Sequence, residues 1–180
     1  MTQKELDTYY IKVAELCSNN SKANRLNVGA ILVKDQQIIS DGFNGTPCGF
    51  ENECEDFVCE KGFVNCTKIV KDSSTGEDKK FCCKSVCLDS NHNLCKYATL
   101  KTKPYVLHAE ANCLMKSLRQ GNSTVGSTIY ITHAPCVECS KLIIQAGVSR
   151  VVYKHSYKNE DGINILKKAN ITVEKYSDNV

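Results

Sequence analysis

The chain has 180 residues and a formal net charge of +3, from 23 Lys and Arg against 20 Asp and Glu. This length suits one ordinary globular domain, and so small a charge excludes a strong electrostatic surface for long nucleic acid, which makes a small anionic ligand the better expectation. No stretch approaches the roughly 20 apolar residues of a membrane span, and the first ten residues lack the apolar core of an export signal. We therefore expect a protein of the cytoplasm, or of the host cytoplasm if the source is viral, with no membrane partner.

Twelve cysteines are unusual in a chain of this length. A disulfide framework and metal binding would both explain the count. Because thiols stay reduced in the cytoplasm, clustered cysteines there more often hold metal, and the sequence favours metal binding.

The first elements along the chain are a predicted helix and a predicted hairpin. From Thr2 to about Ser18, apolar residues recur at helical spacing, and Thr2 with Glu5 has the form of a capping box. Residues 28–33 and 37–40 are β-rich runs separated by three polar residues, which predicts two strands joined by a short turn.

The next segment, from about residue 48 to 105, is polar and rich in cysteine. It lacks sustained periodicity of either kind. A loop this long is uncommon in a compact domain unless something ties it down. We interpret it as an insert within a single domain of residues 1–180.

Helices and strands alternate in the remainder of the chain. Patterning predicts helices at residues 108–120, 136–146 and 163–169, and strands at residues 128–132, 150–153 and 171–174. Glycine follows each of the first two helices, as is typical of a helix end. With the two earlier strands, this predicts a three-layer α/β/α fold around a mixed five-stranded sheet.

The strongest chemical signal lies at the predicted starts of two of these helices, His-Ala-Glu at 108–110 and Pro-Cys-Val-Glu-Cys at 135–139. Cys136 and Cys139 are three residues apart, so in a first helical turn their sulfurs face the same way, and the helix N-terminus favours thiolates. Neutral His108 would be a third ligand. Three protein ligands leave the fourth tetrahedral position of zinc to water, which is typical of a catalytic site.

Glu110, two residues after His108, is a candidate proton shuttle beside such a site. H-x-E followed by P-C-x-x-C is the known signature of zinc base deaminases. Hydrolysis at C4 of cytosine by such an enzyme needs a proton on ring N3 and later one on the departing ammonia, hence a carboxylate outside the metal shell. A lone C-x-x-C or a lone histidine would be weak evidence, and we interpret His133 and His155 as ordinary histidines.

Further stretches make the chain resemble the deoxycytidylate deaminases of the cytidine deaminase-like superfamily, over nearly all of the sequence outside the insert. They are Asn-Val-Gly-Ala at 27–30, Asp-Gly-Phe-Asn-Gly-Thr-Pro at 41–47 with Gly49, and Val152 and Tyr153 leading to Tyr157. The resemblance implies the cytidine deaminase-like fold. It also implies zinc-dependent hydrolysis of deoxycytidine monophosphate (dCMP) to deoxyuridine monophosphate (dUMP) and ammonia, in pyrimidine deoxynucleotide metabolism.

The resemblance implies substrate-binding residues as well. Asn44 would contact the sugar, Thr46 the phosphate region, and Tyr157 would line the pocket beside Ala109. Arg119 would contact the phosphate or another subunit. The alternatives are a plain turn for the first two, a half-buried aromatic side chain for Tyr157, and a solvated helix-end arginine for Arg119.

Glycines offer a physical argument for the same turn. Gly42, Gly45 and Gly49 flank it, and glycine allows a backbone to approach a ligand closely. We therefore expect this turn to border the substrate.

A second, structural zinc is expected in the insert, where it would supply the constraint that a polar segment lacks. Which four residues bind it is left open. The candidates are Cys54, Cys59, Cys83, Cys87, His92 and Cys95.

Assembly and regulation are implied only by resemblance. It implies a homohexamer that deoxycytidine triphosphate (dCTP) activates and thymidine triphosphate (dTTP) inhibits, with Mg²⁺ accompanying the bound triphosphate. Rival activities are a deaminase of another cytosine nucleotide, of a free nucleoside, of tRNA adenosine or of another amino-heterocycle. A non-catalytic zinc module belongs to a different class. Free-nucleoside enzymes commonly carry Cys in place of His108, a tRNA enzyme needs a basic face, and a structural site has no use for Glu110.

Overall fold

The computed structural model describes residues 1–59, 67–71, 78–82, 98–157 and 159–177, and its account of side chains leaves out residues 57–99. The chain divides into two compact units. The first joins Met1–Asn52 to Val106–Val180, and the second is Glu53–Tyr105, which lies within the segment expected as an insert. A single domain over the whole chain stays a prediction.

The first unit begins with helix α1, Gln3–Ser18, in agreement with the sequence. Its N-cap is Thr2, whose Oγ1 accepts the Glu5 backbone N–H at 3.3 Å, while the Thr2 N–H donates to the Glu5 carboxylate at 2.6 Å. This reciprocal pair is the predicted capping box. It satisfies two of the backbone donors that every helix start leaves open.

A five-stranded sheet forms the centre of the first unit. Its strands are β1 (Gly29–Lys34), β2 (Gln37–Phe43), β7 (Thr128–His133), β8 (Arg150–His155) and β9 (Thr172–Lys175). The strand order is β2-β1-β7-β8-β9; β1 runs antiparallel to both neighbours, whereas β7, β8 and β9 are parallel. The predicted mixed sheet is therefore confirmed.

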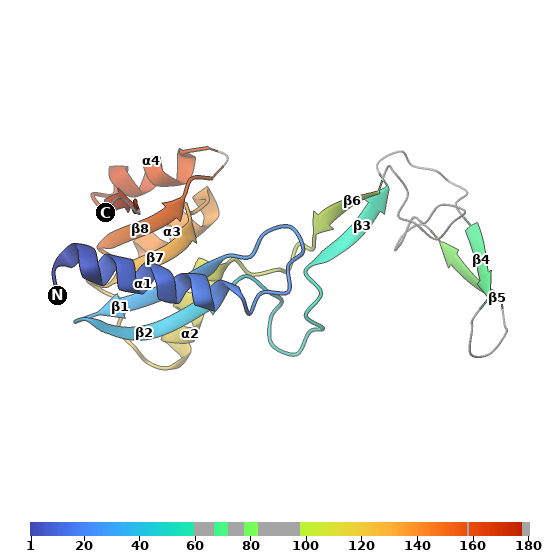
Figure 1. The fold of residues 1–180 in the computed structure, drawn as a ribbon, viewed down its shortest axis with the longest axis horizontal. Helices are drawn as coiled ribbons and strands as arrows, with labels where there is room; N and C mark the ends of the chain where they lie inside the picture. The colour runs from blue at the N-terminus through green and yellow to red at the C-terminus, as the bar shows by residue number, and fades with distance from the viewer. Residues whose placement is uncertain (60–66, 72–77, 83–97, 158, 178–180) are drawn as a thin grey trace. The chain divides into compact units, whose positions relative to one another are not determined.

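Helices cover both faces of this sheet (Figure 1). Helix α1 lies over one face, where Ile11 and Ala14 pack against Ile31 and Tyr130 in one buried cluster. The other face is covered by α2 (Ala109–Arg119), α3 (Val137–Gln145) and α4 (Asp161–Lys168).

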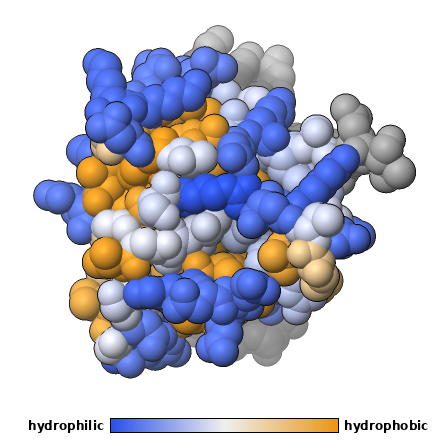
Figure 2. All heavy atoms as spheres, turned by 90° about the vertical axis from the view of Figure 1, so that its left-hand side faces the viewer, coloured by the Kyte–Doolittle hydropathy of each residue, from blue (hydrophilic) through white to orange (hydrophobic). Residues whose placement is uncertain are grey.

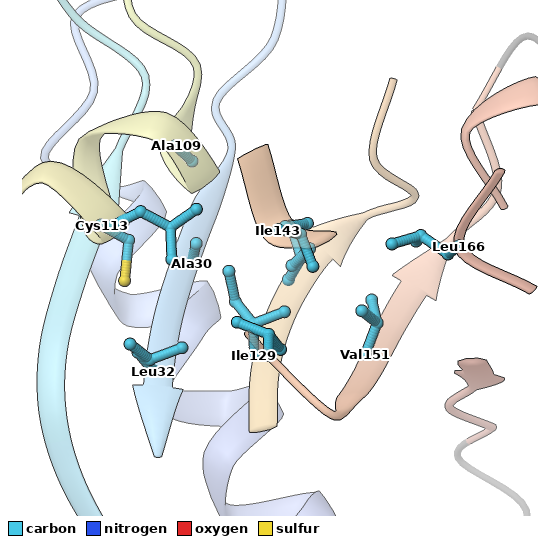
Figure 3. Packing of buried hydrophobic residues seen from close by; sticks show 11 residues of the cluster. Ala30, Leu32, Ala109, Cys113, Ile129, Ile143, Val151 and Leu166 are labelled. Carbon is cyan, nitrogen blue, oxygen red and sulfur yellow. The ribbon is translucent and has the colours of Figure 1, made fainter. Parts of the chain in front are cut away.

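Figure 3 shows the buried cluster on that second face. Because side chains alternate between the faces of a strand, the residues of β1 that face α2 are the neighbours of those that face α1. The side chains labelled there are Ala30, Leu32, Ala109, Cys113, Ile129, Ile143, Val151 and Leu166. Burial on both faces makes this an α/β/α fold of three layers, as the sequence predicts.

Short paired strands make up the described part of the second unit. Strand β3 (Glu55–Cys59) pairs antiparallel with β6 (Ala98–Thr102), and β4 (Thr67–Lys71) pairs antiparallel with β5 (Asp78–Cys82). The expectation that this segment lacks regular structure was wrong. The strands have only five residues each and contain charged residues, so backbone pairing leaves little hydrophobic pattern to detect.

The surface carries both hydrophobic and hydrophilic side chains. On the side where the N-terminus lies, hydrophobic side chains gather in patches between hydrophilic ones (Figure 2). Among the helices of the described residues, none has the length and apolar character needed to cross a membrane.

Candidate metal centre and active site

Two helix starts on the same face of the sheet carry the candidate metal ligands. His108 is the N-cap of α2, with φ −72° and ψ 157°, and Cys136 is the N-cap of α3, with φ −74° and ψ 170°. Both residues thus have the extended backbone typical of an N-cap, which places their side chains at the helix ends rather than along the helix surface. Cys139 follows within the first turn of α3.

The three ligand atoms lie at the distances that zinc requires. His108 Nδ1 is 3.5 Å from Cys136 Sγ and 3.4 Å from Cys139 Sγ. All three ligand atoms lie within 4.8 Å of one another. A tetrahedral zinc with bonds of about 2.0 Å to nitrogen and about 2.3 Å to sulfur separates N from S by about 3.6 Å. The residues therefore fit zinc, and they leave one tetrahedral position open.

The charges of this cluster suit metal binding. Hydrogen bonds from the Cys139 thiol and from His108 lower the pKa of Cys136 to about 3, so its thiolate is the stable form. The hydrogen bond to Cys136 raises the pKa of His108, and the same neighbour together with burial raises the pKa of Cys139. A cation at this point would remove the competition for protons and favour both thiolates.

Glu110 lies beside the cluster in the first turn of α2, and its side chain is buried. Burial raises the pKa of its carboxyl group, and the neighbouring His108 offsets this only in part. A carboxyl group that exchanges its proton nearer to neutral pH is suited to general acid and base work. The arrangement thus joins a three-ligand metal site to a buried proton carrier.

Comparison with known families tests this chemistry. The family model described as "Cytidine and deoxycytidylate deaminase zinc-binding region" matches residues 4–155, which include the whole cluster. The chain belongs to this deaminase family.

Individual family members resemble the chain over nearly its whole length. Deoxycytidylate deaminase of Enterobacteria phage T4 is 33% identical over 169 residues, covering 91% of this chain and 86% of the phage protein. The enzyme of the same name from Saccharomyces cerevisiae is 31% identical over 174 residues, covering 95% of this chain but 45% of the yeast protein. Among solved structures, dCMP deaminase of cyanophage S-TIM5 in complex with dCMP and dUMP has a TM-score of 0.69 and 35% identity, covering 98% of this chain and 100% of that one.

The turn after β2 holds the first two predicted substrate residues. The Asn44 side chain bridges backbone of the α1–β1 connection: its amide group donates to Leu26 O at 2.9 Å, and its oxygen accepts the Val28 N–H at 2.8 Å. The Thr46 hydroxyl donates to Glu51 O at 3.1 Å. Both side chains therefore have structural partners, and their contacts with substrate stay predictions.

The other predicted substrate residues are spread along the unit. Ala109 is fully buried next to His108, whereas Tyr157 is exposed just after β8. Arg119 is the exposed last residue of α2. At 1.5 Å per residue the helix places it about 16 Å from the metal cluster. That separation favours the subunit-contact alternative for Arg119 over contact with a substrate of the same chain, and its role stays a prediction.

His133 and His155 lie outside the metal cluster. His133 and His155 are neighbours on β7 and β8, with ring centroids 5.0 Å apart. They line a groove of about 600 Å³ with α1 residues. Its lining residues are Lys12, Glu15, Leu16, Ser18, Asn19, Asn27, Thr132, His133 and His155.

The candidates for a second zinc fall almost entirely beyond what the structure describes. Cys54 is buried, and burial raises the pKa of its thiol. The side chains of Cys59, Cys83, Cys87, His92 and Cys95 lie outside the described residues. A structural zinc stays a prediction.

Two residues that support the site were not identified from the sequence in that role. The Asn112 side chain donates to Phe43 O at 2.9 Å and so ties α2 to the end of β2. Gly42 was expected to approach a ligand, but it lies within β2 against α2, where a Cβ would be 2.4 Å from Ala109 O. Its missing side chain lets the helix that carries His108 and Glu110 lie directly on the strand. A glycine just after a β-rich run was the only signal for this contact.

Proposed function

We propose that this chain hydrolyses dCMP to dUMP and ammonia with a bound zinc ion. The observation that carries the proposal is the cluster of His108, Cys136 and Cys139 with the buried carboxyl group of Glu110 beside it. The S-TIM5 dCMP deaminase, solved with dCMP and dUMP, supports the choice of substrate because it is 35% identical over 98% of this chain.

The residues of the chain have distinct tasks in this reaction. His108, Cys136 and Cys139 would hold zinc, which when bound lowers the pKa of water toward neutrality. Glu110 takes a proton from the attacking water and delivers it to ring N3 of cytosine. The water oxygen bonds to C4 in this step. Glu110 next takes the remaining proton of that oxygen and delivers it to the exocyclic amino group, which leaves as ammonia when its bond to C4 breaks. The oxygen of the water stays on C4 as the carbonyl of dUMP.

Contacts with the rest of the nucleotide are part of the proposal. Asn44 retains one amide hydrogen and one lone pair beyond its two backbone bonds, so it is still able to bind the sugar. The hydrogen of Thr46 is given to Glu51 O, so Thr46 would have to release that bond before donating to a phosphate oxygen. Tyr157 would border the pocket, and the N–H of Ala109 lies in the open first turn of α2.

Assembly as a homohexamer is supported by one face of α2. Met115, Leu118 and Arg119 are spaced to share a helix face, and Met115 and Leu118 are 47% and 69% exposed. Exposed apolar side chains next to an arginine are typical of subunit contacts. Activation by dCTP, inhibition by dTTP, Mg²⁺ with the triphosphate, a second zinc and action in the cytoplasm complete the proposal.

A comparison of substrates tests the proposal. Ammonia release is measured from dCMP, from deoxycytidine and from a tRNA anticodon stem with the reduced, zinc-loaded protein. We expect dCMP to react with the highest kcat/KM. Preference for deoxycytidine or for the tRNA stem would replace dCMP as the substrate, and no release from any of them would favour a zinc module without catalysis.

A further inference from the structure

Helix α4 begins against the turn that supplies the metal ligand Cys136. Gly162, in the first turn of α4, has no side chain, and a Cβ built on it would lie 2.1 Å from Pro135 O and 3.0 Å from the Cys136 carbonyl carbon. The first separation is far shorter than any real contact of a Cβ atom. Any larger residue would therefore have to displace either α4 or the backbone of the Pro135–Cys136 turn.

Other contacts prevent α4 from moving away from the turn. Ile163, the next residue of α4, packs with Ala134 and Tyr153 in one buried cluster. The Ala134 N–H donates to His155 O at 2.8 Å, which fastens the chain just before Pro135 to the end of β8. Strain introduced at Gly162 therefore has few ways to relax other than through the ligand turn.

The start of α3, which follows the turn, also lies close to Gly162. The Ser140 N–H donates to Cys136 O at 2.9 Å and so begins α3. The Ser140 hydroxyl oxygen is buried, without a hydrogen-bond partner in the described part of the chain, and would lie 2.9 Å from a Cβ on Gly162. A methyl group at residue 162 would thus meet the start of α3 as well as the turn that precedes it.

We propose that Gly162 is a positioning residue of the metal centre. By letting α4 lie directly on the Pro135 carbonyl, it sets the position of the Cys136 backbone and so holds Cys136 Sγ 3.5 Å from His108 Nδ1. It touches neither metal nor substrate. This inference rests on the proposed zinc site and adds α4 to the elements that determine its geometry.

Replacement by alanine separates this role from a purely helical one. Alanine favours helix formation more than glycine does, so Gly162→Ala would stabilise α4 if the turn exerted no constraint. If Gly162 positions the turn, the same change displaces Cys136 and weakens zinc binding. A purely helical role therefore predicts a more stable α4 with parental zinc affinity, whereas the positioning role predicts weaker zinc binding.

The test measures zinc affinity by competition with a chromophoric chelator, with two matched variants. Gly29→Ala introduces an equally close contact, 2.0 Å from Ala14 O, between β1 and α1 and away from the cluster. Asn164→Ala changes an exposed residue of α4 itself. We expect Gly162→Ala to weaken zinc binding by about tenfold to a hundredfold, the range seen when support of a metal ligand is lost. Parental affinity in Gly162→Ala, or an equal loss in Gly29→Ala, would overturn the proposal.

A measurement on the parent protein covers the case in which Gly162→Ala does not fold. Because coupling between two sites is reciprocal, zinc should slow the amide hydrogen exchange of α4 together with that of α3, and leave α1 unchanged. If zinc binds the cluster without slowing exchange in Asp161–Lys168, the role of Gly162 is contradicted but the proposed function is not. A protein that binds no zinc at the cluster contradicts the proposed function as well.

Discussion

The two units of the chain differ in what orders them. In the first unit, helices α1 to α4 bury apolar side chains on both faces of a five-stranded sheet, and the metal ligands stand on helix ends held by that core. In the second, the described strands are short pairs that contain charged residues. We therefore expect burial to order the catalytic centre and bound metal to order the Cys-rich segment.

The largest effect is expected from removal of a ligand of the catalytic zinc. Cys139→Ser replaces a buried thiol by a hydroxyl, which is a poor ligand for zinc, so we expect loss of one zinc per chain and of detectable deamination. Because the core orders the centre, the far-ultraviolet circular dichroism should stay parental. Metal analysis and ammonia release check this. Cys17→Ser is the control, because the Cys17 thiol contacts Asp41 and is not part of the metal cluster.

Glu110→Gln should have the next largest effect. The amide keeps the shape of the side chain but carries no exchangeable acid, so kcat should fall by at least the roughly hundredfold typical of a lost acid–base group, while zinc stays bound. Glu138→Gln is the matched control, since Glu138 is exposed in the first turn of α3 and pairs with Lys141 at the surface. Near-parental turnover of zinc-loaded Glu110→Gln would remove the proton shuttle from the account.

A buried ion pair offers a test of how the core is stabilised. Arg150 Nη2 lies 2.7 Å from Asp7 Oδ2, with both side chains largely buried, and Tyr130 also donates to Asp7. Asp7→Asn should lower the free energy of unfolding at neutral pH by about 2 kcal/mol, measured by urea denaturation. Lys141→Ala, which breaks an exposed pair, should cost less than about 1 kcal/mol.

The same pair gives a dependence on pH. Burial alone would raise the pKa of Asp7, but the hydrogen bonds from Arg150 and Tyr130 outweigh it and hold the pKa below its usual value of 3.8. A depressed pKa in the folded state contributes stability that is complete above the pKa of the unfolded chain and is lost as the pH falls through the folded value. The difference in stability between the parent and Asp7→Asn should thus shrink below about pH 4. A difference that grows as the pH falls would contradict this assignment.

The smallest effect on turnover is expected in the second unit. Replacement of both Cys83 and Cys87 by Ser should remove a second zinc while changing kcat for dCMP much less than Cys139→Ser does, because the catalytic ligands belong to the core. Metal analysis under reducing conditions measures the zinc content of both variants. One zinc per chain in the parent, or no loss in the double variant, would leave the second unit without its proposed metal.

The elements that the sequence predicted are those with a local cause. A capping box indicated the start of α1, and runs of residues that favour β-structure indicated β1 and β7. His-Ala-Glu together with the spacing of Cys136 and Cys139 indicated the metal centre. Strands β4 and β5 gave no such signal because charged residues stand among the apolar ones in five-residue segments.

Sequence patterns also could not predict contacts between segments that are far apart in the chain. The contact of Gly162 with Pro135 joins segments 27 positions apart and depends on how α4 packs, which no spacing rule encodes. The bonds from Asn44 to the backbone of Leu26 and Val28 are of the same kind. Sequence patterns therefore predicted the ligands but not the contacts that hold them in place.

The most direct test is a crystal structure of the reduced protein with dCMP, with anomalous scattering recorded on both sides of the zinc absorption edge. We predict a zinc peak bounded by His108 Nδ1, Cys136 Sγ and Cys139 Sγ, with the pyrimidine ring of dCMP or of its product dUMP between that peak and the Glu110 carboxylate. An absent peak at this cluster, or a disulfide between its two thiols, would contradict the account.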